Sequence, residues 1–266
     1  MKKILLAGLL CATLVLSMVA QVVAAPVDGW TGLLEAGAST MEMKDGVPTI
    51  VCTGPDVWGG FYRPNDPVDP NGYTTEFTYS HPGKLNGEVL DDGATKFDGW
   101  YAIGLTDGKG DPTWSTGNGP VGLYLIIKPI AEKEAEVQFF GFGDVDAQKL
   151  PLTLGSKVKF QIKKVNDAWE LYFNDTKVDL KKGDAAVDTK ALSDEFAKIG
   201  QDGKAYPWFA VWTQPPFADL KMSLAINSFG TVKEEPKAEP AKEEAKAAEP
   251  VKENPKTGDV SAIAYV

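Results

Sequence analysis

Lys157-Val158-Lys159-Phe160-Gln161-Ile162-Lys163 alternates without a break between polar and apolar side chains. Successive side chains of a β-strand point to opposite faces, so this run predicts a strand whose three apolar side chains are buried and whose lysines lie in water. Residues 169–173 repeat the pattern. Asn174-Asp175 then predicts a tight turn into residues 176–178, and residues 165–167 predict a second hairpin turn.

The same period of two recurs along most of the chain, separated by clusters of Gly, Pro, Asn and Asp. Further strands are expected at residues 73–80, 100–105, 121–127, 135–142, 208–213 and 220–226. The side chains expected to face the core are Val158, Phe160, Ile162, Leu171, Phe173, Leu224 and Ile226. Leu192, Phe196 and Ile199 instead recur at helical spacing, which predicts one short helix near residues 189–199.

Composition limits the function classes. The net charge is −10 and Arg63 is the only arginine, so the chain lacks the clustered cations that nucleic-acid phosphates require. The chain has one histidine, His81, and two cysteines, of which Cys11 lies in the apolar N-terminal segment. Cys52 is therefore expected to be a small buried residue without a disulfide partner, and a zinc site or a catalytic triad would need residues that are absent.

Three apolar stretches together resemble a known fold family. These are residues 98–107 (DGWYAIGLTD), 122–129 (GLYLIIKP) and 169–174 (WELYFN). They resemble the strand order of concanavalin A-like lectin and glucanase domains. This resemblance implies an all-β, two-sheet antiparallel jelly-roll sandwich over residues 26–232, with the one short helix as an addition. It describes architecture more specifically than activity.

The resemblance leaves two activities to weigh, glycan hydrolysis and glycan binding. Retaining glucanases of this fold carry Glu-x-Asp-x-x-Glu on one strand, because two carboxylates about 5 Å apart must act as nucleophile and acid/base. This sequence lacks that motif, and its nearest acidic alternation, Glu132, Glu134 and Glu136, is expected on a turn and a solvated strand edge. No glycosidase activity is therefore expected.

Aromatic residues in Gly- and Pro-rich segments indicate a binding surface, because flat rings stack on the apolar C–H faces of sugars while polar groups bind the hydroxyls. Trp100 and Trp169 alternate within strands and are expected in the core. Trp208 and Trp212 share a strand face, so one is expected to be buried and the other to lie at the rim. The candidate carbohydrate-binding residues are Trp58, Tyr62, Asp107, Asp111, Trp114, Asn118 and Trp212.

No cofactor is expected. Asp107 and Asp111 flank a glycine loop that calcium could use, but Lys109 stands where a calcium site would need another oxygen, so turn chemistry is favoured. Asp144 and Asp146 are similarly ambiguous.

The two ends of the sequence predict where the protein is located. Residues 1–24 have a basic start and an apolar run, typical of a secretory signal peptide. Residues 233–253 are rich in Pro, Glu, Lys and Ala, which predicts a disordered, extended stalk. The pentapeptide Asn254, Pro255, Lys256, Thr257 and Gly258 resembles a sortase sorting signal of Gram-positive cell-wall proteins, which implies cleavage between Thr257 and Gly258.

A complete sorting signal continues into an apolar span, whereas residues 260–266 provide seven residues, too few to cross a hydrocarbon core of about 30 Å. Residues 254–266 are therefore interpreted as a truncated signal. The expected location is extracellular and wall-associated. The expected partners are a polysaccharide or a glycosylated surface, together with sortase and peptidoglycan, and the membrane only transiently before sorting. A structural or adhesive module that recognises protein is the alternative, and a glycoside hydrolase the third hypothesis.

Overall fold

A computed structural model of the chain describes residues 27–36, 39–53, 59–81, 83–108, 122–166, 168–192, 199, 203–213 and 221–232. The chain divides into two compact units, Met1–Lys233 and Glu234–Val266, and every described residue belongs to the first. The predicted signal peptide, stalk and sorting signal lie outside the described residues. Within the described part, no helix has the length and apolar character that a membrane crossing requires.

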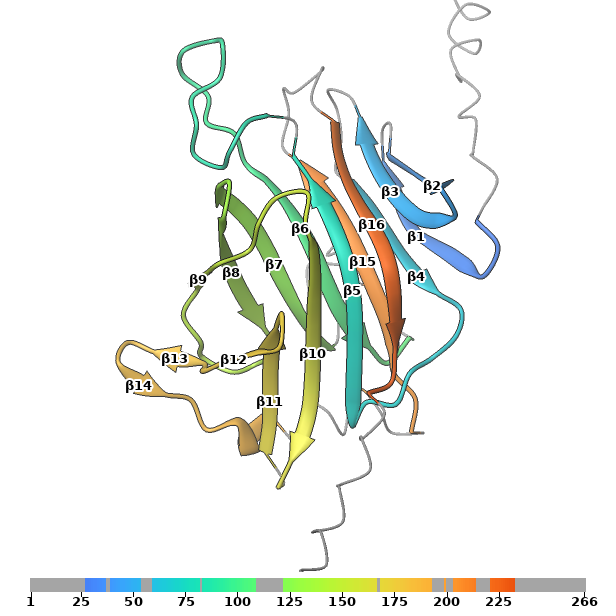
Figure 1. The fold of residues 1–266 in the computed structure, drawn as a ribbon, viewed down its shortest axis with the longest axis vertical. Coiled ribbons are helices and arrows are strands. Elements are labelled where there is room, and N and C mark those ends of the chain that lie inside the picture. The colour runs from blue at the N-terminus through green and yellow to red at the C-terminus, as the bar shows by residue number, and fades with distance from the viewer. Residues whose placement is uncertain are drawn as a thin grey trace, which may run out of the picture. The chain divides into compact units, whose positions relative to one another are not determined.

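The first of two large sheets, sheet A, has seven antiparallel strands (Figure 1). In spatial order these are β1 (Trp30–Ala36), β4 (Gly59–Pro64), β15 (Tyr206–Thr213), β6 (Gly99–Thr106), β7 (Gly122–Ala131), β8 (Glu134–Phe140) and β9 (Gln148–Leu150).

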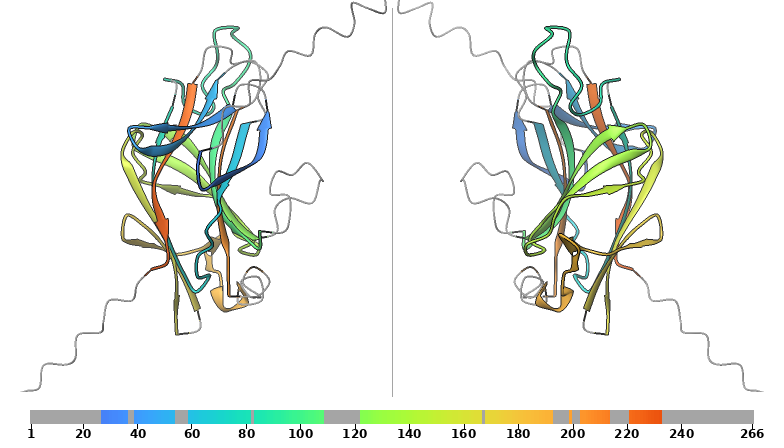
Figure 2. Two further views of the ribbon diagram at one scale, coloured as in Figure 1. Left: turned by 90° about the vertical axis from the view of Figure 1, so that its right-hand side faces the viewer. Right: turned by 90° about the vertical axis from the view of Figure 1, so that its left-hand side faces the viewer.

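The second sheet, sheet B, also has seven antiparallel strands, and Figure 2 shows the two sheets as stacked layers. In spatial order these are β12 (Thr176–Val178), β11 (Ala168–Phe173), β10 (Lys157–Val165), β5 (Gly72–Ser80), β16 (Lys221–Gly230), β3 (Val47–Thr53) and β2 (Ser39–Lys44). A small separate ribbon pairs β13 (Lys181–Lys182) with β14 (Ala185–Ala186). The chain crosses repeatedly between the sheets, which confirms the predicted all-β, two-sheet antiparallel jelly-roll sandwich.

The core between the sheets follows from the alternation in β10 and β11. All seven side chains predicted to face the core are at most 4% exposed. Phe160 packs on Phe173 with ring centroids 5.0 Å apart, across the β10–β11 pair in which these two residues are opposite each other. Burying a side chain of this size stabilises the fold by about 2 to 3 kcal/mol.

The predicted turn after β11 is also present. Asn174 and Asp175 have φ angles of 48° and 63°, the left-handed conformation that both central residues of a type I′ hairpin turn adopt. Asn174 Oδ1 accepts a hydrogen bond from the backbone N–H of Lys159 at 2.9 Å, which ties the turn to β10.

The predicted helix near residues 189–199 is described only at its ends. A 3₁₀ helix, η1, covers Thr189–Leu192, and residues 193–198, which include Phe196, lie outside the described residues. Leu192 and Ile199 are both buried in the core, as their helical spacing predicts.

Candidate functional site

Sheet A is apolar on both of its faces. All eight residues of β6 are buried. Tyr101 and Ile103 point into the core between the sheets, whereas Trp100 and Ala102 belong to a second apolar cluster. Because side chains alternate along a strand, this second cluster lies on the outer face of sheet A.

Six aromatic rings dominate this outer cluster, and together they are called the aromatic face: Phe61, Trp100, Tyr124, Phe140, Trp208 and Trp212. They come from five adjacent strands, β4, β15, β6, β7 and β8.

The rings of the aromatic face form stacked pairs between neighbouring strands. Trp100 lies opposite Trp212, with ring centroids 5.1 Å apart and planes 25° from parallel. Tyr124 lies opposite Phe140, with centroids 4.5 Å apart and planes only 3° from parallel. Register across the sheet therefore sets both pairs, as expected for cross-strand aromatic neighbours.

Small residues separate the two pairs. Ala210 lies opposite Ala102, and Trp208 lies opposite Gly104. Ala102 and Ala210 are fully buried between the two pairs, and Gly104 leaves room for the Trp208 indole.

Accessible ring surface is concentrated at two residues. Trp212 and Phe140 are partly exposed, whereas the other four rings of the aromatic face are at most 8% exposed. Each partly exposed ring is thus stacked against a buried ring of the neighbouring strand, which restricts its position.

Charged groups follow the aromatic face along one side. Lys128, two residues beyond Ile126 on the same face of β7, forms an ion pair with Asp98 at 2.9 Å. Across the next pair of strands Lys128 lies opposite Glu136, whose Oε1 accepts a hydrogen bond from Gln138 Nε2 at 3.1 Å. Glu136 in turn lies opposite Lys149. The result is a row of alternating charges across four neighbouring segments.

The opposite side carries Arg63, whose guanidinium carbon lies 4.7 Å from the centre of the Tyr206 ring. A cation over an aromatic face is attracted by the ring quadrupole. Both residues are partly exposed, and each keeps hydrogen-bonding groups at the margin of the aromatic face.

The structure distributes the seven predicted site residues unequally. Trp212 lies on the aromatic face, and Asp107 is a partly exposed residue just after β6. The other candidates outside strand β4, namely Trp58, Asp111, Trp114 and Asn118, lie outside the described residues.

Tyr62 corrects the sequence interpretation. It was expected in a Gly/Pro loop, but residues 59–64 form β4, and Tyr62 is 2% exposed in the core between the sheets. The physical reason is alternation: its neighbour Phe61 takes the outer face, so Tyr62 points inward. Gly59, with a φ of 105°, permits this pairing, because a Cβ there would lie 2.1 Å from the backbone oxygen of Val211.

The two tryptophans expected in the core differ. Trp169 is 3% exposed in the core between the sheets, as predicted. Trp100 is 7% exposed and is thus buried as predicted, but in the apolar cluster on the outer face of sheet A and not between the sheets. Trp208 is fully buried and Trp212 partly exposed, which confirms the predicted difference between them.

The sequence interpretation missed Phe61, Trp100, Tyr124, Phe140 and Trp208 as members of one surface. The signal was present as uninterrupted apolar runs in the segments of β6, β7 and β15, which are typical of strands buried on both faces. Among the described residues, no group of three or more His, Cys, Asp or Glu side chains could hold a metal ion. Asp111 lies outside the described residues, so the expectation of turn chemistry rather than calcium binding at this loop stays a prediction.

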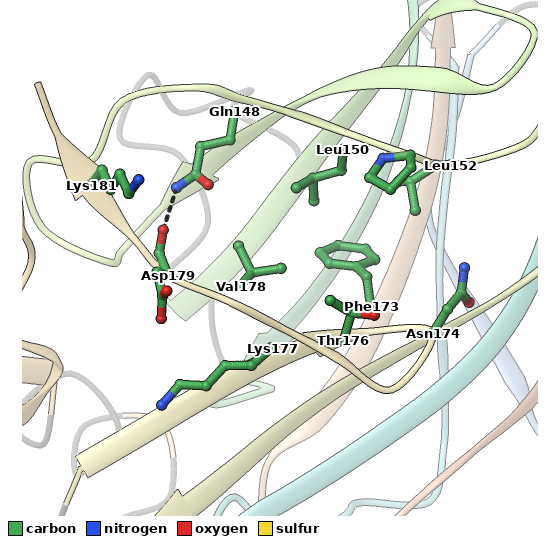
Figure 3. Close-up of a pocket in the computed structure, with 11 residues that line it drawn as sticks. Gln148, Leu150, Leu152, Phe173, Asn174, Thr176, Lys177, Val178, Asp179 and Lys181 are labelled. Carbon is green, nitrogen blue, oxygen red and sulfur yellow. Dashed lines mark hydrogen bonds between the residues drawn. The ribbon is translucent and has the colours of Figure 1, made fainter. Parts of the chain in front are cut away.

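A separate cavity of about 280 Å³ lies at one side edge of the sandwich, between β9 and β12 (Figure 3). Its inner wall is apolar, with Leu150, Phe173 and Val178. Gln148 Nε2 donates a hydrogen bond to the backbone oxygen of Asp179 at 3.1 Å, so this edge pocket is bridged beside its opening. Its volume suits a small molecule better than a polymer.

A larger cavity of about 630 Å³, the loop pocket, lies beside the connection from β5 to β6. His81, Lys84 and Glu88 line one side of it, and Glu132, Lys133 and Leu154 line the other. It shares no residue with the aromatic face.

Comparisons with known proteins give structural likenesses only. No protein-family model and no curated protein matches the chain. Among solved structures, the chain is similar to the carbohydrate recognition domain of Emp46p in its potassium-bound form, with 14% identity, a TM-score of 0.43, and coverage of 77% of this chain and 90% of that one.

Two glucanases give similar values. A β-1,3-1,4-glucanase derived from a mouse hindgut metagenome has 10% identity and a TM-score of 0.46, covering 78% of this chain and 95% of that one. A Bacillus licheniformis β-glucanase has 10% identity and a TM-score of 0.44, with coverage of 78% and 93%. The strand pairing of this chain itself defines its two-sheet fold.

Proposed function

We propose that the protein is a non-catalytic carbohydrate-binding module whose aromatic face contacts a polysaccharide or a glycosylated surface. The observation that carries the proposal is the stacked pair of Trp100 and Trp212, in which the buried ring supports a partly exposed one on an apolar sheet face. A sugar ring presents C–H groups that pack on such a surface, and the support from behind reduces the entropy lost on binding.

The margins of the aromatic face supply what sugar hydroxyls need. Asp98 and Glu136 provide carboxylate acceptors, and Gln138 and Lys128 provide donors. Because the charges in this row alternate in sign, the margin has little net charge. Hydrogen bonding to an uncharged chain of sugars is therefore favoured over attraction of a polyanion.

A second element of the proposal concerns location. We place the protein outside the cell, joined to peptidoglycan by a sortase that recognises residues 254–258. The support is the sequence itself, with an apolar leader at one end and the sorting pentapeptide behind a Pro-rich stalk at the other.

Two other functions make different predictions. An adhesive module that recognises protein would use the same apolar face but would bind without competition from oligosaccharides. A glycoside hydrolase would release reducing ends from the polymer that it binds. Neither has a specific observation in its favour beyond the aromatic face that all three share.

Affinity electrophoresis of the intact protein in gels containing soluble polysaccharides tests the proposal. At least one neutral polysaccharide should retard the protein, and Trp212→Ala should weaken that binding about 10- to 100-fold, which corresponds to about 1 to 3 kcal/mol for loss of a stacking ring. Tyr172→Ala is the matched control, because Tyr172 is a partly exposed ring on the outer face of sheet B.

Equal weakening of binding by Trp212→Ala and Tyr172→Ala would contradict the proposal. So would a failure to bind any polysaccharide, either in the gels or on a broad glycan array. Release of reducing ends from a bound polymer would instead support the hydrolase hypothesis.

A further inference from the structure

The only histidine of the chain lies in an unusual setting, away from the aromatic face. His81 follows β5 and contacts Phe97 edge to face, with ring centroids 4.8 Å apart. Its Nε2 is a buried atom with no hydrogen-bond partner in the described part of the chain. Buried polar groups without partners are rare and destabilising, so this one needs an explanation.

Hydrogen bonds fix the protonation of the ring. Tyr101 Oη donates its single hydrogen to the backbone oxygen of Ser80, which can only accept. Tyr101 Oη also lies 3.1 Å from His81 Nδ1, and because its hydrogen is already used, it must accept there. His81 Nδ1 therefore carries the hydrogen. A neutral imidazole has only one N–H, so Nε2 holds an unshared electron pair.

Protonation would place a second N–H at a buried position without an acceptor. The apolar surroundings disfavour the charged ring, and burial lowers the pKa of His81 to about 4 from 6.5. The observed position of the His81 ring, packed against Phe97 and Tyr101, is thus compatible only with the neutral imidazole.

The loop pocket beside His81 offers space for the protonated ring. His81 borders the loop pocket, about 630 Å³ in volume, where Glu88 and Glu132 are exposed. The other charged groups that line this pocket are Lys84, which lies 3.6 Å from Asp91, and Lys133. Among the described residues that contact the ring itself, only Tyr101 has a titratable group, and burial raises the pKa of its phenol far above neutrality.

The segment next to His81 is anchored at its base, where Asp98 also forms an ion pair with Lys128. Residues 83–98 form an irregular hairpin in which Gly87 N donates to Phe97 O and Phe97 N donates to Glu88 O, each at 2.9 Å. The Asn86 side chain anchors it by binding both backbone groups of Gly99 and the backbone oxygen of Pro129. Phe97, packed against His81, is its main buried side chain.

We propose that His81 is a pH-sensitive latch: on protonation its ring leaves Phe97 and Tyr101 for the loop pocket, and the hairpin of residues 83–98 loosens. Acidification from pH 6.5, the ordinary pKa of histidine, to pH 4, near the pKa of the buried ring, then favours the state in which the ring has left Phe97. Well inside this range each pH unit should raise the opening equilibrium about tenfold, which gives a rise of about 80-fold between pH 6.5 and pH 4.

The first test uses nitrogen NMR of the intact protein with isotope-labelled histidine, which gives one set of ring signals because the chain has one histidine. At pH 7 the Nδ1–H tautomer is expected, and the titration midpoint should lie well below 6.5. An Nε2–H tautomer, or a midpoint at 6.5, would overturn the proposal.

The second test measures native-state hydrogen exchange of the Gly87, Leu90 and Phe97 amides from pH 7 to pH 4, corrected for intrinsic exchange. Opening should rise with acidity in the wild type but not in His81→Asn, whose amide can still donate to Tyr101 and does not titrate. The same rise in His81→Asn would assign the effect to carboxylates, above all Asp92, which accepts hydrogen bonds from Thr95 and Ala94 within the hairpin, and would refute the latch. Amides of β11 report global unfolding and should stay far better protected than the hairpin amides at every pH, which would show that the opening is local.

Discussion

Gly104 lies directly opposite Trp208 across the β6–β15 pair, and a Cβ atom at residue 104 would come within 2.2 Å of Trp208 Nε1. The indole therefore lies over the backbone of β6, in space that any other residue type would fill.

Gly104→Ala should consequently displace Trp208, a fully buried ring. The expected destabilisation is about 1 to 3 kcal/mol, as for an overpacked core, measured by urea unfolding. Trp208 is stacked with Phe61, another ring of the aromatic face, at a centroid distance of 5.9 Å. A displaced Trp208 should therefore disturb that face and weaken polysaccharide binding as well. Gly230→Ala is the control, since a Cβ there meets nothing within 4 Å and the variant should unfold at nearly the same urea concentration.

Stability should fall with acidity because of His81. Its folded pKa of about 4 lies below the ordinary 6.5, so between these values the unfolded chain binds the proton and the native chain does not. The free energy of unfolding should therefore drop as the pH falls from 6.5 toward 4, by about 3 kcal/mol in total. Urea unfolding of His81→Asn over the same range should lack this component, and an unchanged slope would disprove its origin in His81.

The hairpin turn after β11 allows backbone strain and hydrogen bonding to be separated. Asn174→Ala should destabilise the protein by about 1 to 2 kcal/mol, because it removes the acceptor for Lys159 N–H and puts alanine at a φ of 48°. Asn174→Gly loses only the hydrogen bond, so it should be less destabilising. Equal effects in thermal unfolding would mean that strain is unimportant there.

The core between the sheets should be sensitive to loss of volume. Phe160 contacts both Phe173 and Tyr73, so Phe160→Ala should reduce the free energy of unfolding by about 3 to 5 kcal/mol. Lys159→Ala, the neighbour on the outer face of the same strand, serves as the control. It should change stability by less than about 1 kcal/mol, since it removes only an exposed ion pair with Asp175.

The sequence predicted the fold best in strands that have one solvent-exposed face. The alternation in β10 and β11 gave the strands, the turn at Asn174 and the buried side of each residue. It was least informative where both faces are apolar: in β6, the period of two cannot distinguish the side of Trp100 from that of Tyr101. Glycines misled the interpretation at β4, because Gly59 and Gly60 are typical of loops but serve here for close strand packing.

The candidate site was predictable only in part for the same reason. Trp212 could be recognised by its spacing from Trp208, whereas the pairing of Tyr124 with Phe140 depends on the register between β7 and β8. Such a register follows from long-range strand pairing and not from local sequence.

The bridge between Gln148 and Asp179 has a consequence for self-association. The strands at this side of the sandwich, β9 and β12, have three residues each, and the backbone N–H of Asp146 is already bonded to Lys181 O at 2.9 Å. At the other side, a bulge between Gly32 and Leu34 interrupts β1, and β2 presents the exposed charges of Glu42 and Lys44. Short, irregular or charged edges offer poor templates for strand addition, so copies of this protein crowded together should resist edge-to-edge aggregation.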